Sequence, residues 1–70
     1  MTKNTHQSLE RGLAVLEFVA SAGRPVTLAE TARYMNLHRS TVHHMMRALV
    51  HMGHLKQHDD SHVYERTGTV

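Results

Sequence analysis

Cysteine and tryptophan are both missing from this 70-residue chain, and it contains a single proline. Without cysteine there are no disulfides, no thiolate catalysis and no cysteine-ligated zinc, a composition compatible with a reducing cytosol. Long apolar runs are missing too: the longest, Leu13 to Leu16, falls far short of the ~20 residues that a membrane-spanning helix needs. The polar start, Met1 to Gln7, has no apolar signal segment behind it. We therefore expect a soluble, unexported, cytoplasmic protein.

The short length limits the fold to one small domain. Such a chain buries only ~60% of the surface that it exposes when unfolded, so its core is thin and leaves little room for an enclosed substrate pocket. We expect a flexible N-terminal arm over residues 1–7, one folded domain over residues 8–66 and a frayed end over residues 67–70.

Acidic residues are absent from residues 33–56, although the net charge of the whole chain is only +2. The positive and protonatable residues of this stretch are Arg33, Arg39, Arg47, Lys56, His38, His43, His44, His51 and His54. Because a free imidazole titrates near pH ~6.5, the stretch becomes more positive as the pH falls. This charge distribution favours an anionic partner.

The first helical pattern covers residues 8–22. Its apolar positions recur at steps of four, three and four, which is typical of an amphipathic helix. These positions are Leu9, Leu13, Leu16 and Ala20, with Val15, Phe18 and Val19 beside them. Ser8 is a candidate N-cap, and Gly23 and Pro25 end the helix. The leucines can face the core, a second copy of the helix, or both.

Two further helices follow, separated by a tight turn. The spacing of Thr27 and Glu30 fits a capping box, so the second helix begins there after at most a short extended piece at Pro25 and Val26. Asn36 tolerates a positive φ and predicts a sharp turn. The third helix then extends over about 38–52 and ends at Gly53.

The third helix has two unlike faces. We expect its apolar half to pack against the first two helices, with the methionines at positions 35, 45, 46 and 52 filling the core. That apolar half consists of Val42, Met45, Met46, Leu49 and Met52. The opposite arc is polar or cationic and consists of Ser40, His43, His44, Arg47 and His51.

A β-hairpin is predicted after the third helix. Leu55–Gln57 and His62–Arg66 flank an Asp-rich turn, and we expect Leu55, Val63 and Tyr64 to contact the core. Helix, turn, helix and hairpin in this order predict a mainly α fold: a three-helix winged helix-turn-helix with a short C-terminal β-hairpin wing. The outward arc of residues 38–52 then suits a DNA major groove ~12 Å wide.

Four segments resemble the N-terminal DNA-binding domain of the IclR family of bacterial transcription regulators. They are Gln7–Glu17, Val26–Glu30, Leu37–His43 and Leu49–Leu55, and the resemblance covers about residues 7–66. It implies a winged helix-turn-helix that binds operator DNA, usually as a dimer to which the first helix contributes. It also implies that Arg39, Ser40, Thr41 and His43 meet DNA.

The chain departs from the family pattern in three ways. His38 stands where the family usually has proline, and His44 stands where arginine is common. Family members usually continue into a larger effector-binding domain, which this sequence does not contain. It is therefore either one domain of a longer protein or a small stand-alone regulator.

We expect the DNA contacts to divide among three regions. On the third helix, Arg39 and Arg47 supply charge and contact guanine, Ser40 and Thr41 make short polar contacts, and His43 and His44 read bases or phosphates according to their protonation. The N–H groups around Thr27 and Leu28 are candidates for a phosphate clamp. The wing cations expected to contact phosphates are Lys56, His58, His62 and Arg66.

Other functions are less well supported by the pattern. His54, His58 and His62 are spaced by four, but they span a turn and a hairpin and so share no helical face; we expect no metal or other cofactor. Asp59 and Asp60 have no accompanying nucleophile, so we do not expect an enzyme. The partner expected is double-stranded DNA, with a homodimer in which exposed Phe18 and Val19 take part. The alternative is a winged-helix module for protein interaction or dimerisation without DNA binding.

Overall fold

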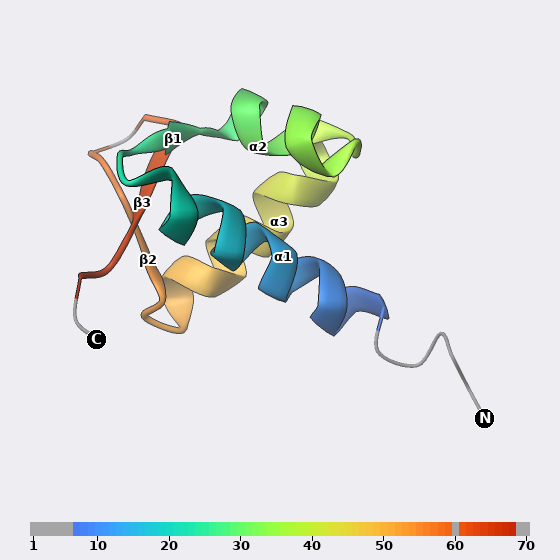
Figure 1. Ribbon diagram of the computed structural model, residues 1–70, viewed down its shortest axis with the longest axis horizontal. Coiled ribbons are helices and arrows are strands. Elements are labelled where there is room, and N and C mark those ends of the chain that lie inside the picture. Colours follow the sequence, from blue (N-terminus) through green and yellow to red (C-terminus); the bar gives the residue numbers. More distant parts are fainter. Residues whose placement is uncertain (1–6, 60, 69–70) are drawn as a thin grey trace.

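The computed structural model describes residues 7–59 and 61–68, which form three helices and a small sheet (Figure 1). Along the chain the elements are α1 (Gln7–Ala22), β1 (Val26–Thr27), α2 (Leu28–Met35), α3 (Arg39–His51), β2 (Leu55–Gln57) and β3 (Val63–Arg66). This arrangement confirms the predicted winged helix-turn-helix. Residues 1–6 of the expected arm and residues 69–70 of the expected frayed end lie outside the described residues.

The sheet has one more strand than the predicted hairpin. Its order is β1-β3-β2, and both pairings are antiparallel. Val26 of β1 pairs with Tyr64 of β3, and Lys56 of β2 pairs with Glu65 of β3. The N–H of Leu28 donates to the carbonyl of His62 at 2.9 Å, which joins the wing to the first residue of α2. The wing is therefore hydrogen-bonded to the start of α2, and through β2 it also continues the chain from the end of α3.

The core lies where the three helices meet the sheet. Its buried apolar side chains are Val15, Val19, Val26, Leu28, Ala32, Val42, Met46, Leu49, Leu55 and Tyr64. Ala32 of α2 is buried, and the predicted inward positions of α3 are confirmed at Val42 and Met46. Met35 and Met45 are partly buried and pack against this core.

On α1 the buried positions differ from the expected leucine stripe. Val15 and Val19 face the core, whereas Leu9 and Leu13 are 59% and 51% exposed. The prediction that Val19 is exposed for pairing is therefore wrong, and Phe18 is half-buried, with its ring stacked on Tyr34 at a centroid distance of 4.4 Å. Apolar residues cover more than half of this helix, so periodicity alone does not choose which of them two neighbouring helices will cover.

Three smaller predictions need correction, one at the C-terminal end of the third helix and one near each end of the described chain. Met52, expected in the core, is 64% exposed because α3 ends at His51 and Gly53 turns the chain away with φ 89°. Thr67, expected in a frayed end, donates through its hydroxyl to the carbonyl of Gly53 at 3.0 Å. Gln7, expected in the arm, is the first residue of α1.

Candidate nucleic-acid interface

The turn between α2 and α3 fixes the angle at which α3 is presented. Asn36 adopts the left-handed conformation with φ 58°, as the sequence predicted. Its N–H donates to the carbonyl of Arg33 at 3.2 Å, and the N–H of Leu37 donates to the carbonyl of Ala32 at 3.1 Å. These bonds satisfy carbonyls at the end of α2 that the helix itself leaves free.

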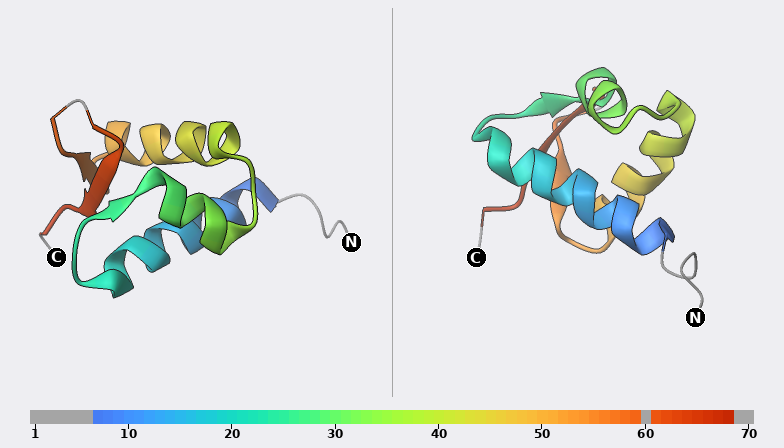
Figure 2. Two further views of the ribbon diagram at one scale, coloured as in Figure 1. Left: turned by 90° about the horizontal axis from the view of Figure 1, so that it is seen from above. Right: turned by 45° about the vertical axis from the view of Figure 1, so that its right-hand side comes forward.

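Within residues 7–59 and 61–68, no other helix covers the outer side of α3. Figure 2 (left) shows α3 along one side of the molecule, with α1 and α2 both on its other side. Ser40, His44 and Arg47 are exposed and His43 is half-buried, so these four residues of the predicted outward arc are accessible. Arg39 and Thr41 are exposed as well. The helix contains no acidic residue, and its surface is therefore positive or neutral.

Ion pairs do not neutralise this surface. Within residues 7–59 and 61–68, the ion pairs are Arg24 with Glu30 and His58 with Glu65. Neither involves a residue of α3. The first turn of α3 also has no acidic residue, and the side chain of His38 makes no capping hydrogen bond there. The first N–H groups of α3 thus lack the side-chain acceptor that usually compensates a helix start.

The start of α2 is arranged in the opposite way. The hydroxyl of Thr27 accepts from the N–H of Glu30 at 3.0 Å, and the carboxylate of Glu30 accepts from the N–H of Thr27 at 2.8 Å. Arg24 donates to the same carboxylate at 3.0 Å. The hydrogen bond from Arg24, followed by that from Thr27, lowers the pKa of Glu30 to about 2. A carboxylate therefore already occupies this helix start.

The predicted phosphate clamp at Thr27 and Leu28 does not have free donors. The N–H of Thr27 is bonded to Glu30, and the N–H of Leu28 is bonded to His62. Sequence reasoning recognised the capping box but did not see that the box and the wing would use both N–H groups. A DNA contact by the exposed Thr27 stays a prediction.

The wing brings one histidine to the outer side of α3. We call this side, with Ser40, His43, His44 and Arg47, the recognition surface. The ring of His62 meets the ring of His43 edge to face, with centroids 5.5 Å apart. His62 is exposed, so the wing extends the surface of α3 with a further protonatable group. Of the four predicted wing contacts, His62 therefore lies beside α3, and its phosphate contact stays a prediction.

The other three predicted wing contacts lie in different surroundings. The ring of His58 is 2.6 Å from the carboxylate of Glu65, so His58 braces the hairpin. Lys56 is exposed and pairs across the strands with the same Glu65. Arg66 lines a small cavity of about 100 Å³ beside Val19 and Gly23, near the C-terminal end of α1. Their phosphate contacts stay predictions, and Arg66 lies apart from His62.

Tyr64 places a phenol in the core, and its ionisation is affected both by burial and by a charge on α3. Its side chain is fully buried, and its hydroxyl has no hydrogen-bond partner within the described residues. Burial raises the pKa of Tyr64, and the positive charge of Arg47 opposes this rise.

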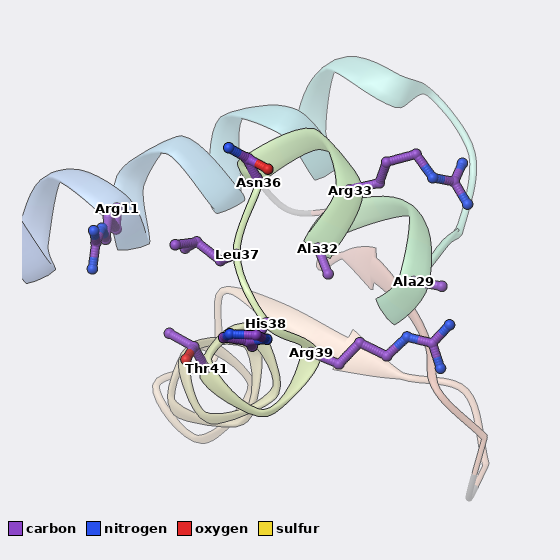
Figure 3. Close-up of a pocket in the computed structure, with 9 residues that line it drawn as sticks. All are labelled: Arg11, Ala29, Ala32, Arg33, Asn36, Leu37, His38, Arg39 and Thr41. Atoms are coloured by element: carbon purple, nitrogen blue, oxygen red, sulfur yellow. The ribbon is translucent and has the colours of Figure 1, made fainter.

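A cationic cleft at the turn contains a residue that sequence reasoning did not place in the site. The cleft has a volume of about 680 Å³ and is lined by Arg11, Arg33 and Arg39, one from each helix. Figure 3 shows Arg33 and Arg39 extending to the same side, with Ala29 between them, while Arg11 lies across the cleft on α1. The signal for Arg33 was its position four residues after Ala29, on the face of α2 opposite to its buried residues.

An apolar groove separates α1 from the C-terminal half of α3. It has a volume of about 440 Å³. Leu9, Leu13 and Leu16 line one side, and Met45 and Met52 line the other. His44 also reaches this groove, so the recognition surface and the apolar groove share an edge.

Two searches of the described residues were negative. No helix among them is long and apolar enough to cross a membrane. Within the same residues, no three histidine, aspartate or glutamate side chains gather closely enough to hold a metal ion.

Comparison with known proteins gives one family and one solved structure. The helix-turn-helix domain of the IclR family matches residues 8–59, most of the chain. The crystal structure of an IclR family transcriptional regulator from Brucella abortus aligns with a TM-score of 0.77 and 24% identity, which supports the fold. The alignment covers 97% of this chain and 29% of that one, so this chain spans less than a third of that regulator. The curated proteins gave no match.

Proposed function

This chain belongs to the IclR helix-turn-helix family, and from that premise we propose that it binds double-stranded DNA sequence-specifically and regulates transcription. α3 lies in the major groove, which at ~12 Å wide admits one helix. The protein acts in the cytoplasm as a binding module rather than an enzyme. A protein-interaction module with the same fold is the competing proposal.

The observation that carries this proposal is the uncovered outer side of α3. Its exposed polar and cationic residues have no acidic partner among residues 7–59 and 61–68. Like charges on one surface repel one another, and this repulsion destabilises the folded chain. The phosphate groups of DNA offset the repulsion directly. A solvated face without a ligand has no need to exclude every acidic residue.

Individual residues have separate roles in the proposed complex. Arg47 donates both arms of its guanidinium to one guanine, and Ser40 and Thr41 make short contacts near the start of α3. His43 and His44 contact bases or phosphates. On the wing, His62 contacts the sugar-phosphate backbone beside α3, with Lys56 further along the duplex.

One titration tests the proposal. The protein is equilibrated with a randomised duplex pool at two salt concentrations, and the bound sequences are recovered. We expect enrichment of a defined sequence and an affinity that falls as salt rises. An Arg47→Ala variant should lose about 1 to 3 kcal/mol on the enriched duplex and discriminate less at one base. A protein-interaction module would bind no duplex at physiological salt, and that outcome overturns the proposal.

We further infer that the chain pairs as a homodimer on DNA. The support is the apolar groove, because Leu9, Leu13 and Met52 are all more than half exposed around it. Large side chains of this kind at one place on a small domain mark a contact surface. Leu13→Glu tests this inference, with pairing followed by analytical ultracentrifugation. The variant should bind single half-sites but lose the tighter binding to paired half-sites. Unchanged pairing of that variant would contradict it.

A further inference from the structure

The strongest unassigned feature is the pair formed by Arg33 and Arg39. Arg33 belongs to α2 and Arg39 to the first turn of α3, and both side chains are exposed on one side of the cleft (Figure 3). The residue between them, Ala29, has a single methyl group and leaves space between the two guanidinium groups. Two elements thus present the same charged group toward one open volume.

Nothing within the described residues compensates these two charges. Among the residues that the structure describes, no acidic side chain lines the cleft, and the nearby Glu30 is bonded to Arg24 and Thr27. Arginine presents a planar fork of donors that matches phosphate oxygens and binds them more specifically than a lysine does. A compact anion with several oxygens is the ligand that fits between two such forks.

We propose that Arg33 and Arg39 bind one and the same backbone phosphate of the DNA, at the edge of the groove that α3 enters. This site rests on the DNA binding proposed above. The neighbouring N–H groups at the start of α3 lack a side-chain cap and are further donors close to Arg39 in the chain. A duplex phosphate is favoured over a free anion because Ser40, in the groove-facing surface, follows Arg39 directly in the chain.

This assignment has a consequence for specificity. Arg39 becomes a backbone contact rather than a reader of guanine, and base reading on α3 is left to residues further along the helix. Arg33 makes α2 a second contact point with the duplex. Because one phosphate is shared between two helices, its position fixes the depth and the rotation of α3 in the groove.

Affinity measurements on single and double variants test the shared phosphate. Arg33→Ala and Arg39→Ala should each weaken binding about tenfold at low salt. The loss should be equal on the selected and on a random duplex, and the salt slope should fall by ~1. The double variant should lose less than the product of the two single losses because both residues contact one group. Multiplying losses would mean two separate phosphates and would overturn the proposal.

Phosphate ethylation interference identifies the group itself. On the selected duplex, one ethylated phosphate should weaken binding of the unaltered protein but no longer weaken binding of either variant. Arg11→Ala is the matched control, since Arg11 lines the same cleft from the other side and should leave the pattern and the salt slope unchanged. Arg33→Lys retains the charge without the fork and should recover the salt slope but only part of the affinity.

Three results separate failure of this site from failure of the proposed function. If Arg33→Ala binds as tightly as the unaltered protein while Arg47→Ala does not, the phosphate site is wrong and DNA binding stands. If the two variants lose sensitivity at different phosphates, the shared site is wrong. If the unaltered protein binds no duplex, both proposals are wrong. Circular dichroism of each variant checks that these exposed substitutions leave the fold intact.

Discussion

Replacing Tyr64 with phenylalanine removes one hydroxyl group from the centre of the core and leaves the ring in place. The side chain is 0% exposed, and its hydroxyl has no hydrogen-bond partner within the described residues. Burying a polar group without a partner costs about 1 to 3 kcal/mol. We expect the variant, which no longer buries this group, to gain about 1 kcal/mol of unfolding free energy.

Thermal unfolding followed by far-ultraviolet circular dichroism measures this gain, since the chain has no tryptophan for fluorescence. For a domain of this size, 1 kcal/mol corresponds to a Tm increase of roughly 4 to 8 °C. Tyr34→Phe is the control: Tyr34 is 62% exposed, so loss of its solvated hydroxyl should change stability by less than about 0.5 kcal/mol.

The pH dependence provides a second measurement. Burial raises the pKa of Tyr64, so the unfolded chain loses this proton at a lower pH than the folded chain does. Ionisation of Tyr64 therefore leaves the unfolding free energy unchanged below about pH 10, the ordinary tyrosine pKa, and lowers it as the pH rises through the folded value. Tyr64→Phe cannot ionise and should not show this loss, so its gain over the unaltered protein should widen above about pH 10. A Tyr64→Phe variant that is less stable by 1 kcal/mol or more, from about pH 7 upward, would refute the reasoning, because the hydroxyl would then have a partner in solution.

Three further outcomes follow from the sites described. The pKa of Glu30 is lowered to about 2, so its carboxylate stabilises the fold above the unfolded pKa of 4.5, and this effect is lost as the pH falls toward 2. In Glu30→Gln, the unfolding free energy measured over that pH window should therefore depend less on pH. Asn36→Ala should lower the unfolding free energy by about 1 kcal/mol at φ 58°, whereas Asn36→Gly should not, as urea unfolding will establish. A double His43→Gln, His62→Gln variant loses the ring contact between the wing and α3 and should bind the selected duplex less tightly at fixed pH and salt; an unchanged affinity would exclude both rings from the DNA contact.

Much of the helical part could be predicted because its signals are local. Asn36 and Gly53 adopt the positive φ values that their residue types favour, and they set the ends of α2 and α3. The capping box at Thr27 and Glu30 requires only the spacing of two residues. The helical period of the apolar positions then identified the outward face of α3.

What sequence reasoning missed depends on contacts between distant segments. β1 is two residues long and forms a strand only because β3 lies beside it. The N–H of Leu28 is occupied by a carbonyl of the wing 34 residues later in the chain, between residues 28 and 62. The site role of Arg33 likewise depends on Arg39, which the turn at Asn36 brings alongside. Local patterns do not contain such partners.

The wing is bonded twice at the start of α2, and this bears on whether the protein or the DNA changes shape in the proposed complex. β1 pairs with β3 immediately before α2 begins, and the bond from Leu28 to His62 closes the same junction. Tilting the hairpin alone would therefore break main-chain bonds at the base of the neighbouring helix. In the proposed complex, bending and twisting of the double helix supply the fit instead, so we expect base steps that the protein never touches to influence, by their stiffness, how tightly the duplex is held.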